Sequence, residues 1–518
     1  MAATQTAKGQ GLLKSSLVVG MMTLVSRVLG LIRDMVIAQA FGAGAGADAF
    51  FVAFKIPNFL RRLFAEGAFN QAFVPVLSEY QTQRSAAEVK ALVDRVAGSL
   101  GMALTLVTAL AMLASPLLVW LFAPGFHVDE VKFALTVEML RITFPYLLLI
   151  SLTAFAGSVL NAYKRFAIPA ITPVWLNVSM IVAALWLAPM LDTPILALAW
   201  GVLAAGVIQL VFQLPFLQRL SLLPRPRSGW SDPGVRRILK LMVPALFGVS
   251  VSQINLLLDT VLASFLQTGS VSWLYFSDRL SELPLGIFGI AIATVVLPAL
   301  SRQHAAQSAD HFAKTLDWAV YMVLLLGLPA ALALVMLAEP MLLTLFGYGQ
   351  MSLFDVQMSA QSLMAYAIGL VAFMLIKVLA PGFYARQDTK TPVKIGIIAM
   401  VANMVFNLIL IWPLAHAGLA LATSMSAFLN AALLGIGLAK AGVWHWQAGW
   451  GGRCLRLLAA LSVLASCIYW GSPDVGVWEQ WGATERAGRM TLLVLGGALG
   501  YGVTLVLFGL RPRHLRGA

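Results

Sequence analysis

Long apolar stretches, separated by short polar segments, follow one another along nearly the whole chain. A helix needs about 20 mainly apolar residues to cross the hydrocarbon core of a bilayer. The pattern therefore predicts an all-α integral membrane protein with about fourteen transmembrane helices. The predicted spans cover residues 12–42, 46–80, 90–122, 131–161, 169–190, 195–219, 233–266, 271–302, 311–344, 355–384, 391–412, 417–440, 452–471 and 488–510.

The second predicted span is too long for a straight crossing. Residues 46–80 would extend over roughly 52 Å as one helix, against a hydrocarbon core of about 30 Å. We expect this span to tilt, to kink at Pro57 or Pro75, or to project into water.

Composition excludes a soluble globule and argues against nucleic acid as a partner. Of 518 residues, 60% are hydrophobic and 11% are charged, whereas soluble domains contain about 25% charged residues. The net charge of +13 comes from short basic clusters between apolar runs, a pattern typical of membrane orientation. Cys454 and Cys467 have no zinc or redox spacing. Arg27 and Arg33 interrupt the first apolar run, so we expect a retained helix, not a cleaved signal peptide.

The distribution of Lys and Arg predicts the orientation. On the predicted spans, 23 of the 35 basic residues fall on one side, and the other side has Lys132, Arg486 and Arg489. Cytoplasmic loops are the basic ones, which places both termini in the cytoplasm of a cell with an inner membrane and requires an even number of spans.

The chain resembles itself at an offset near 223 residues. Residues 115–122 recur at 339–346, and residues 74–78 recur at 297–301. We expect an N-terminal six-helix lobe (1–220), a basic cytoplasmic linker with the start of helix 7 (221–240), a related six-helix lobe (233–440) and two extra helices (441–518). Transporters built from such parallel repeats hold the substrate between the halves.

Charged residues lie inside three predicted spans: Arg27, Arg33 and Asp34 in the first, Asp48, Lys55, Arg61, Arg62 and Glu66 in the second, and Asp278, Arg279 and Glu282 in the eighth. A charge at mid-bilayer costs roughly 2.5–3.5 kcal/mol on insertion scales. One interpretation is a wet cavity whose arginines bind phosphate bidentately. The alternative is structural ion pairing, of Arg33 with Asp34 for example.

Five motifs resemble the MurJ/MviN family of lipid II flippases, which belongs to the multidrug/oligosaccharidyl-lipid/polysaccharide exporter superfamily. They are residues 26–34, 46–58, 61–69, 273–282 and 377–388, and the resemblance extends over essentially the whole chain. It implies that the protein moves lipid II, an undecaprenyl-diphosphate-linked muropeptide, from the cytoplasmic to the periplasmic leaflet for cell-wall synthesis.

The resemblance also implies functional residues. Family cavity arginines match Arg27, Arg33, Arg61 and Arg279, and Asp48 matches a further important position. With Asp34 and Glu282 from the charge clusters, these form the candidate substrate site. Helices 13 and 14 would form a lipid-tail groove. A sodium site in some members matches Asp259, Asn403, Asn407 and Thr423, although Asn407 stands where that pattern has a carboxylate.

Other functions stay open at this point. A flippase for another undecaprenyl-diphosphate-linked oligosaccharide would use the same phosphate chemistry, and a multidrug antiporter would need a more acidic or aromatic cavity. We expect no enzyme, because the chain has no Walker loop, His-Glu-x-x-His or Gly-x-Ser-x-Gly motif. Apart from sodium no cofactor is expected, and the expected partners are lipid II, membrane lipids and a cell-wall synthesis complex, with the chain itself a monomer.

Overall fold

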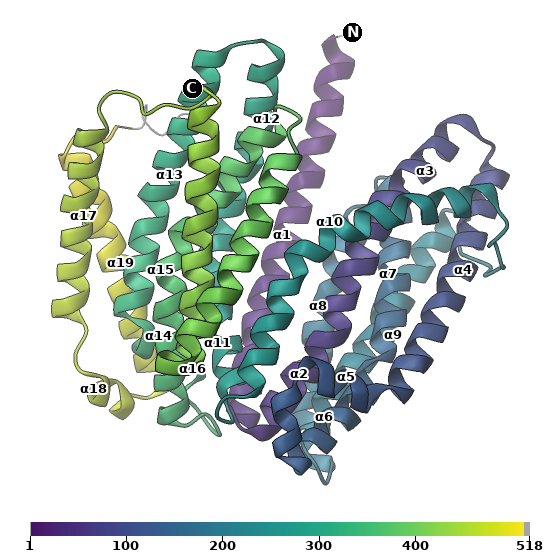
Figure 1. The fold of residues 1–518 in the computed structure, drawn as a ribbon, viewed down its shortest axis with the longest axis horizontal. Coiled ribbons are helices and arrows are strands. Elements are labelled where there is room, and N and C mark those ends of the chain that lie inside the picture. Colours follow the sequence, from purple (N-terminus) through teal and green to yellow (C-terminus); the bar gives the residue numbers. More distant parts are fainter. Residues whose placement is uncertain (1, 512–518) are drawn as a thin grey trace. The chain divides into compact units, whose positions relative to one another are not determined.

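The structure, a computed structural model, describes the backbone of residues 2–511 and the side chains of residues 18–63, 68–246, 254 and 257–511. The described backbone contains helices and no strand, which confirms the predicted all-α class. It divides into two compact units, residues 1–269 and 270–518 (Figure 1).

The first unit contains helices that cover the first seven predicted spans. They are α1 (Ala2–Phe41), α2 (Ala45–Arg61), η1 (Arg62–Phe69), α3 (Asn70–Gln83), α4 (Ala86–Leu113), α5 (Ser115–Phe122), η2 (Pro124–Val128), α6 (Glu130–Thr143), α7 (Pro145–Ala162), α8 (Ala167–Val182), η3 (Ala183–Leu187), η4 (Ala188–Met190), α9 (Leu196–Arg219) and α10 (Pro233–Ser264).

The second unit contains helices that cover the remaining predicted spans. They are α11 (Ser270–Pro284), η5 (Leu285–Gly289), α12 (Ile290–Ala305), α13 (Ala309–Met336), α14 (Ala338–Phe346), α15 (Leu353–Tyr384), α16 (Lys390–Lys440), α17 (Trp450–Gly471), α18 (Val475–Gln480) and α19 (Ala483–Leu507). The short helix α18 lies in a segment for which the sequence pattern predicted no element.

Helix boundaries follow from local chemistry. Ser85 begins α4 with a reciprocal capping box to Glu88, and Ser352 begins α15 in the same way with Asp355, so each box satisfies orphan N–H groups of a first turn. The two spans predicted at 391–412 and 417–440 are two helices, together labelled α16, that meet at a kink at Ala415, whose backbone has φ 48° and ψ −127°. The break lies where the sequence pattern predicted it.

The long second span is helical throughout, with prolines inside α2 and α3. Between Pro57 and Pro75 it changes to a π-helix over residues Arg62–Phe69. A π-helical turn is an irregularity found often at functional positions, and here it follows directly after Arg61.

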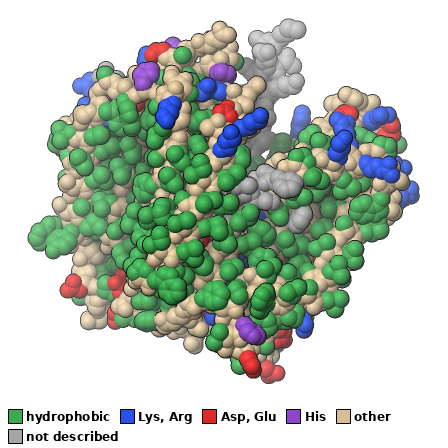
Figure 2. All heavy atoms as spheres, viewed as in Figure 1, with side chains coloured by type: hydrophobic (Ala, Val, Ile, Leu, Met, Phe, Trp, Pro, Cys, Tyr) green, Lys and Arg blue, Asp and Glu red, His purple; other side chains and the backbone are tan. Residues whose placement is uncertain are grey.

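Ten helical stretches of the described chain are long and apolar enough to cross a membrane. On the face drawn in Figure 2, hydrophobic side chains cover the helices along most of their length, and charged side chains gather near helix ends. This arrangement fits a multi-span membrane protein, while fourteen crossings stay a prediction. The lobe boundaries also stay a prediction; within the first unit, α10 packs against η1 and α3.

Helices α17 and α19 pack on one another and on α13 inside the second unit. Leu457, Leu464 and Leu505 join Tyr321 of α13 in one apolar cluster, and the Tyr501 hydroxyl donates to the carbonyl of Leu325 at 2.8 Å. At the start of α17, Arg453 Nη1 and Trp450 Nε1 donate to the carboxylate of Asp317, at 2.6 and 2.7 Å. These contacts attach both helices to α13.

Orientation can be tested with single cysteines in a variant whose exposed Cys454 and Cys467 are replaced by Ser. We expect Asp192→Cys and Gln350→Cys to react with a membrane-impermeant maleimide in intact cells with a permeable outer membrane. Ala87→Cys and Thr389→Cys should react only after lysis, because they lie in the predicted cytoplasmic segments. The reverse labelling pattern would contradict both the orientation and the repeat.

Candidate functional site

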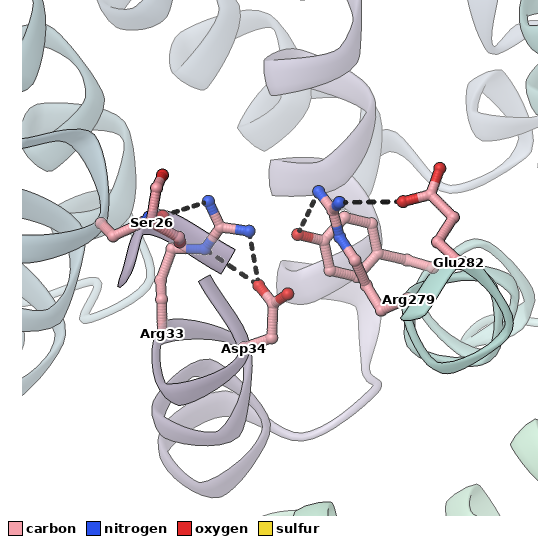
Figure 3. Close-up of polar contacts among 7 residues, drawn as sticks. Ser26, Arg33, Asp34, Arg279 and Glu282 are labelled. Carbon is pink, nitrogen blue, oxygen red and sulfur yellow. Dashed lines mark hydrogen bonds and ion pairs between the residues drawn. The ribbon is translucent and has the colours of Figure 1, made fainter. Parts of the chain in front are cut away.

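The first charge cluster on α1 is a buried ion pair (Figure 3). The Nε and Nη2 atoms of Arg33 both donate to Asp34 Oδ1, at 2.9 and 2.7 Å. Nη1 donates to Asn177 Oδ1 of α8 at 3.0 Å, and Asn177 Nδ2 donates to the carbonyl of Ser26 at 3.0 Å. The guanidinium is therefore oriented by contacts from two helices.

Burial makes this pairing necessary. Arg33 is 5% exposed and Asp34 is 1% exposed, so each charge would be costly alone in apolar surroundings. The structure confirms the ion pair that the sequence offered as one interpretation. A buried guanidinium with a fixed orientation is also prepared for an anionic ligand that takes the place of its carboxylate.

The other arginines of the first unit are more accessible. Arg27 is exposed on α1, and no described carboxylate forms an ion pair with it. Arg61 is half-buried at the end of α2, where its Nε donates to Asn58 Oδ1 at 3.2 Å. Of the residues predicted beside them, Lys55 is half-buried, and the side chain of Glu66 lies outside the described residues.

Asp48 lies in the first turn of α2 and forms a second buried ion pair. Its Oδ2 accepts from Lys132 Nζ of α6 at 2.9 Å and from the backbone N–H of Gly269 at 2.8 Å. The Lys132 ammonium also lies 4.0 Å from the centroid of the Phe126 ring, a favourable cation–π distance. Asp48 therefore connects α2, α6 and the segment that follows α10.

The cluster of the second unit lies on α11 and is more open. Arg279 Nη1 is 3.4 Å from Glu282 Oε2, with the two side chains 37% and 53% exposed, so this pair is weak. The guanidinium carbon lies 5.0 Å from the centroid of the Tyr275 ring, and Nη2 donates to the Tyr275 hydroxyl at 3.3 Å. Arg279 therefore contacts both the Tyr275 side chain and the Glu282 carboxylate, and Figure 3 shows Glu282 beside it.

Three of the residues proposed for sodium form one polar cluster on α16. Asn407 Nδ2 donates to Asn403 Oδ1 at 2.6 Å, and Asn403 Nδ2 donates to Thr423 Oγ1 at 3.5 Å. Their neutral oxygens are of the type that hard cations prefer, and both asparagines are buried. Asp259, the carboxylate of the predicted set, belongs to α10 of the first unit.

The structure adds partners that the sequence did not assign: Lys132, Asn177 and Tyr275. Lys132 was predicted at the periplasmic end of the span 131–161, and it lies in the first turn of α6, at the same predicted membrane side as Asp48. The sequence signal for this pair was that Asp48 and Lys132 have opposite charges and lie at the same predicted side of the membrane. Nothing in the sequence distinguished Asn177 from other polar residues in apolar helices.

Similarity to known proteins assigns the family. A family model described as "Lipid II flippase MurJ" matches residues 37–482. A protein of Vibrio cholerae named "Probable lipid II flippase MurJ" is 52% identical over 514 residues, 98% of each chain. The chain belongs to the MurJ family. The resemblance that the five motifs carried is therefore confirmed.

Solved structures agree with this assignment. A structure titled "Lipid II flippase MurJ, inward closed conformation" is similar with a TM-score of 0.80 and 26% identity, covering 95% of this chain and 98% of that one. An inward-facing multidrug resistance MATE transporter of the MOP superfamily matches with a TM-score of 0.62 and 15% identity over 82% of this chain and 98% of the other. At that identity the likeness shows a shared fold alone. MurJ family membership makes the chain a membrane transporter, not an enzyme.

We expect Lys132→Met to lower the free energy of unfolding by about 3–5 kcal/mol, since it leaves the Asp48 carboxylate buried without its cation. Adding Asp48→Asn should recover most of this loss. Thermal unfolding of the purified protein measures both effects.

The control is Arg84→Met, which removes the cation of the Arg84–Glu88 pair, whose side chains are 58% and 49% exposed. An exposed pair contributes at most about 1 kcal/mol. Equal free energies of unfolding for the Lys132 and Arg84 variants would show that the buried Lys132–Asp48 pair stabilises the protein no more than an exposed pair does.

Proposed function

We propose that this chain is a flippase that moves lipid II from the cytoplasmic to the periplasmic leaflet of the inner membrane. The observation that carries the proposal is the 52% identity to a protein named as such a flippase over 98% of both chains. The internal charges support it, because a hydrocarbon-soluble cargo would not need several arginines inside apolar helices.

We further propose that both termini lie in the cytoplasm and that the chain acts as a monomer beside the enzymes that consume its product. Of the three basic residues on the predicted periplasmic side, Lys132 is paired with Asp48. Arg486 is also buried, and it donates to the carbonyls of Trp478 and Gly347 at 2.9 and 3.1 Å. Only Arg489 of the three is exposed, so the predicted periplasmic loops present few accessible positive charges, as the proposed orientation requires.

In the proposed mechanism, Arg27, Arg33, Arg61 and Arg279 bind the diphosphate of the substrate while the protein alternates between inward- and outward-open states. Asp34 and Glu282 act as exchangeable partners. When no substrate is bound, Asp34 neutralises Arg33 and Glu282 lies beside Arg279, so these two arginines need not be left without a counter-charge. When the diphosphate enters, its oxygens take over the bidentate contacts of the guanidinium groups.

Asp48 has a different proposed role. Because its contacts are Lys132 and the N–H of Gly269, we propose that it positions the end of the α10 segment and does not contact the headgroup. Its loss would disturb the structure near that segment, where Thr268 Oγ1 also lies 3.5 Å from Lys132 Nζ.

Each of Arg27→Ala, Arg33→Ala, Arg61→Ala and Arg279→Ala should abolish rescue of flippase-depleted cells while the protein still accumulates in the membrane. Arg→Lys should rescue partly, because an ammonium keeps the charge and loses the planar fork. The measurements are growth and the lipid-linked intermediate that accumulates, with exposed Arg84→Ala as a control that should rescue fully.

Structural ion pairing makes a different prediction for the same variants. It predicts poor accumulation of Arg33→Ala and recovery when Asp34→Ala is added. Full activity of both Arg27→Ala and Arg279→Ala at normal abundance would overturn the proposed diphosphate site.

We also propose that the α16 cluster, together with Asp259, binds sodium. The oxygens of Asn403, Asn407 and Thr423 fit a hard cation, and Asp259 would supply the negative charge. Bound sodium would compensate that carboxylate and link the transport cycle to the ion gradient.

On this proposal, sodium should raise the thermal unfolding temperature of the purified protein relative to choline at equal ionic strength, and Asp259→Ala should remove the difference. Transport that depends on sodium should lose that dependence in the same variant. A protein indifferent to sodium in both measurements would leave the membrane potential as the simpler energy source.

A further inference from the structure

A polar cleft and an apolar groove meet on the surface of the first unit, at the segment that joins α9 to α10. The polar cleft, of about 520 Å³, is lined by Lys90, Asp94, Arg95, Gln218, Arg225 and Arg227. The apolar groove, of about 700 Å³, is lined by apolar residues of α4, α7 and α9 and by Pro224 and Pro226. The same three segments, α4, α9 and the linker, contribute neighbouring residues to both, so the two spaces adjoin at residues 224–227.

The linker is held closely against α4. Asp94 Oδ1 accepts from the backbone N–H of Arg225 at 2.7 Å, its carbonyl accepts from the N–H of Arg227 at 3.1 Å, and Ser99 Oγ accepts from the N–H of Gly229 at 3.0 Å. A Cβ at Gly98 would lie 2.1 Å from the Arg227 carbonyl oxygen. Only glycine permits this approach, so the linker is a fixed wall of the site.

The Pro-Arg-Pro-Arg run of residues 224–227 separates two kinds of surface. Its prolines line the apolar groove and its arginines line the polar cleft. Proline restricts the backbone, which keeps this alternation in place. A ligand that fills both spaces must therefore be anionic at one end and apolar along the rest.

Charge in the cleft favours an anion. Lys90 pairs with Asp94, and Arg95 pairs with Asp232. Arg225 and Arg227 are exposed, and no carboxylate among the described side chains pairs with either. When Asp232, the partner of Arg95, is counted with these six side chains, two positive charges remain in excess. They are those of Arg225 and Arg227, whose guanidinium groups can bind phosphate oxygens bidentately.

The dimensions of the groove match one leaflet. Its α4 wall extends from Ala97 to Ala109, about 18 Å along the helix axis at 1.5 Å per residue. Half of a hydrocarbon core is about 15 Å. The wall is therefore long enough for one acyl chain that descends from the membrane surface.

We propose that this site binds an anionic glycerophospholipid, with its phosphate between Arg225 and Arg227 and one acyl chain in the groove between α4 and α9. The site belongs to the first unit alone and uses none of the residues assigned to the transported substrate. A lipid bound there would contact α4, α9 and the linker together, and would fix the position from which α10 begins.

The test uses the purified full-length chain and native mass spectrometry, with titrations of phosphatidylglycerol and of phosphatidylcholine that carry the same acyl chains. We expect preferential retention of phosphatidylglycerol. Arg225→Gln with Arg227→Gln should weaken that retention about thirtyfold, since each basic residue near a membrane surface contributes about 1 kcal/mol. The matched control is Lys390→Gln with Lys394→Gln, which removes two exposed charges from the second unit and should change little.

A second variant tests the apolar half. Gly101 lines the groove and has no atom within 4 Å of an added Cβ, so Gly101→Leu should fill the groove without disturbing α4. It should reduce retention of phosphatidylglycerol and leave the thermal unfolding temperature of delipidated protein unchanged or higher. A photoreactive phosphatidylglycerol should cross-link to α4 or to residues 210–227 in the wild type, and less in both variants.

Three results would overturn the proposal. They are equal retention of the two lipids, unchanged retention in the double arginine variant, and full competition by glycerol phosphate without acyl chains, which would indicate a site for free phosphate. None of these measurements involves transport, so their outcome is independent of the proposed flippase activity.

Discussion

An ionised side chain inside an apolar helical protein needs a partner of opposite charge or a full set of hydrogen bonds, and the described structure is arranged around this constraint. Arg33 with Asp34 and Lys132 with Asp48 are almost completely buried pairs. Removing one member of such a pair destabilises the fold by more than the intact pair stabilises it, because the remaining charge is left without water or a counter-ion. The Lys132–Asp48 pair therefore connects α2 with α6. Arg33 and Asp34 pair within α1, and Asn177 connects that pair to α8.

The same constraint bears on the proposed diphosphate-binding residues, which would be used with and without substrate. Pairing of Arg33 within α1 leaves its guanidinium oriented by Asn177, so a diphosphate would exchange with a carboxylate and would not have to order a flexible side chain. Arg279 is held by a weaker, more exposed contact and by the Tyr275 ring. The ion pair of Arg33 is buried and that of Arg279 is exposed. In the proposed mechanism, Arg279 is therefore the more accessible arginine for a first contact with the diphosphate.

The sequence predicted most of the helices, because runs of apolar residues are local signals. The charged residues of the candidate site were predicted from the free-energy cost of placing a charge inside a bilayer and from the family motifs. The sequence did not predict their partners. Lys132 and Asp48 are 84 residues apart, and Asn177 is 144 residues from Arg33, so their contacts depend on how helices pack and not on any periodicity. The break at Ala415 was predicted as the gap between two spans. The π-helix after Arg61 was beyond reach, since prolines indicate that a helix is disturbed but not in which way.

The attachment of α17 and α19 to α13 has a consequence for motion. Asp317 contacts the beginning of α17, and the Leu325 carbonyl accepts from Tyr501 near the end of α19. Because these contacts lie at two levels along α13, α17 and α19 cannot rotate about a single attachment point. A displacement of α13 would therefore carry both helices with it, and the lipids that border them would have to rearrange at the same time.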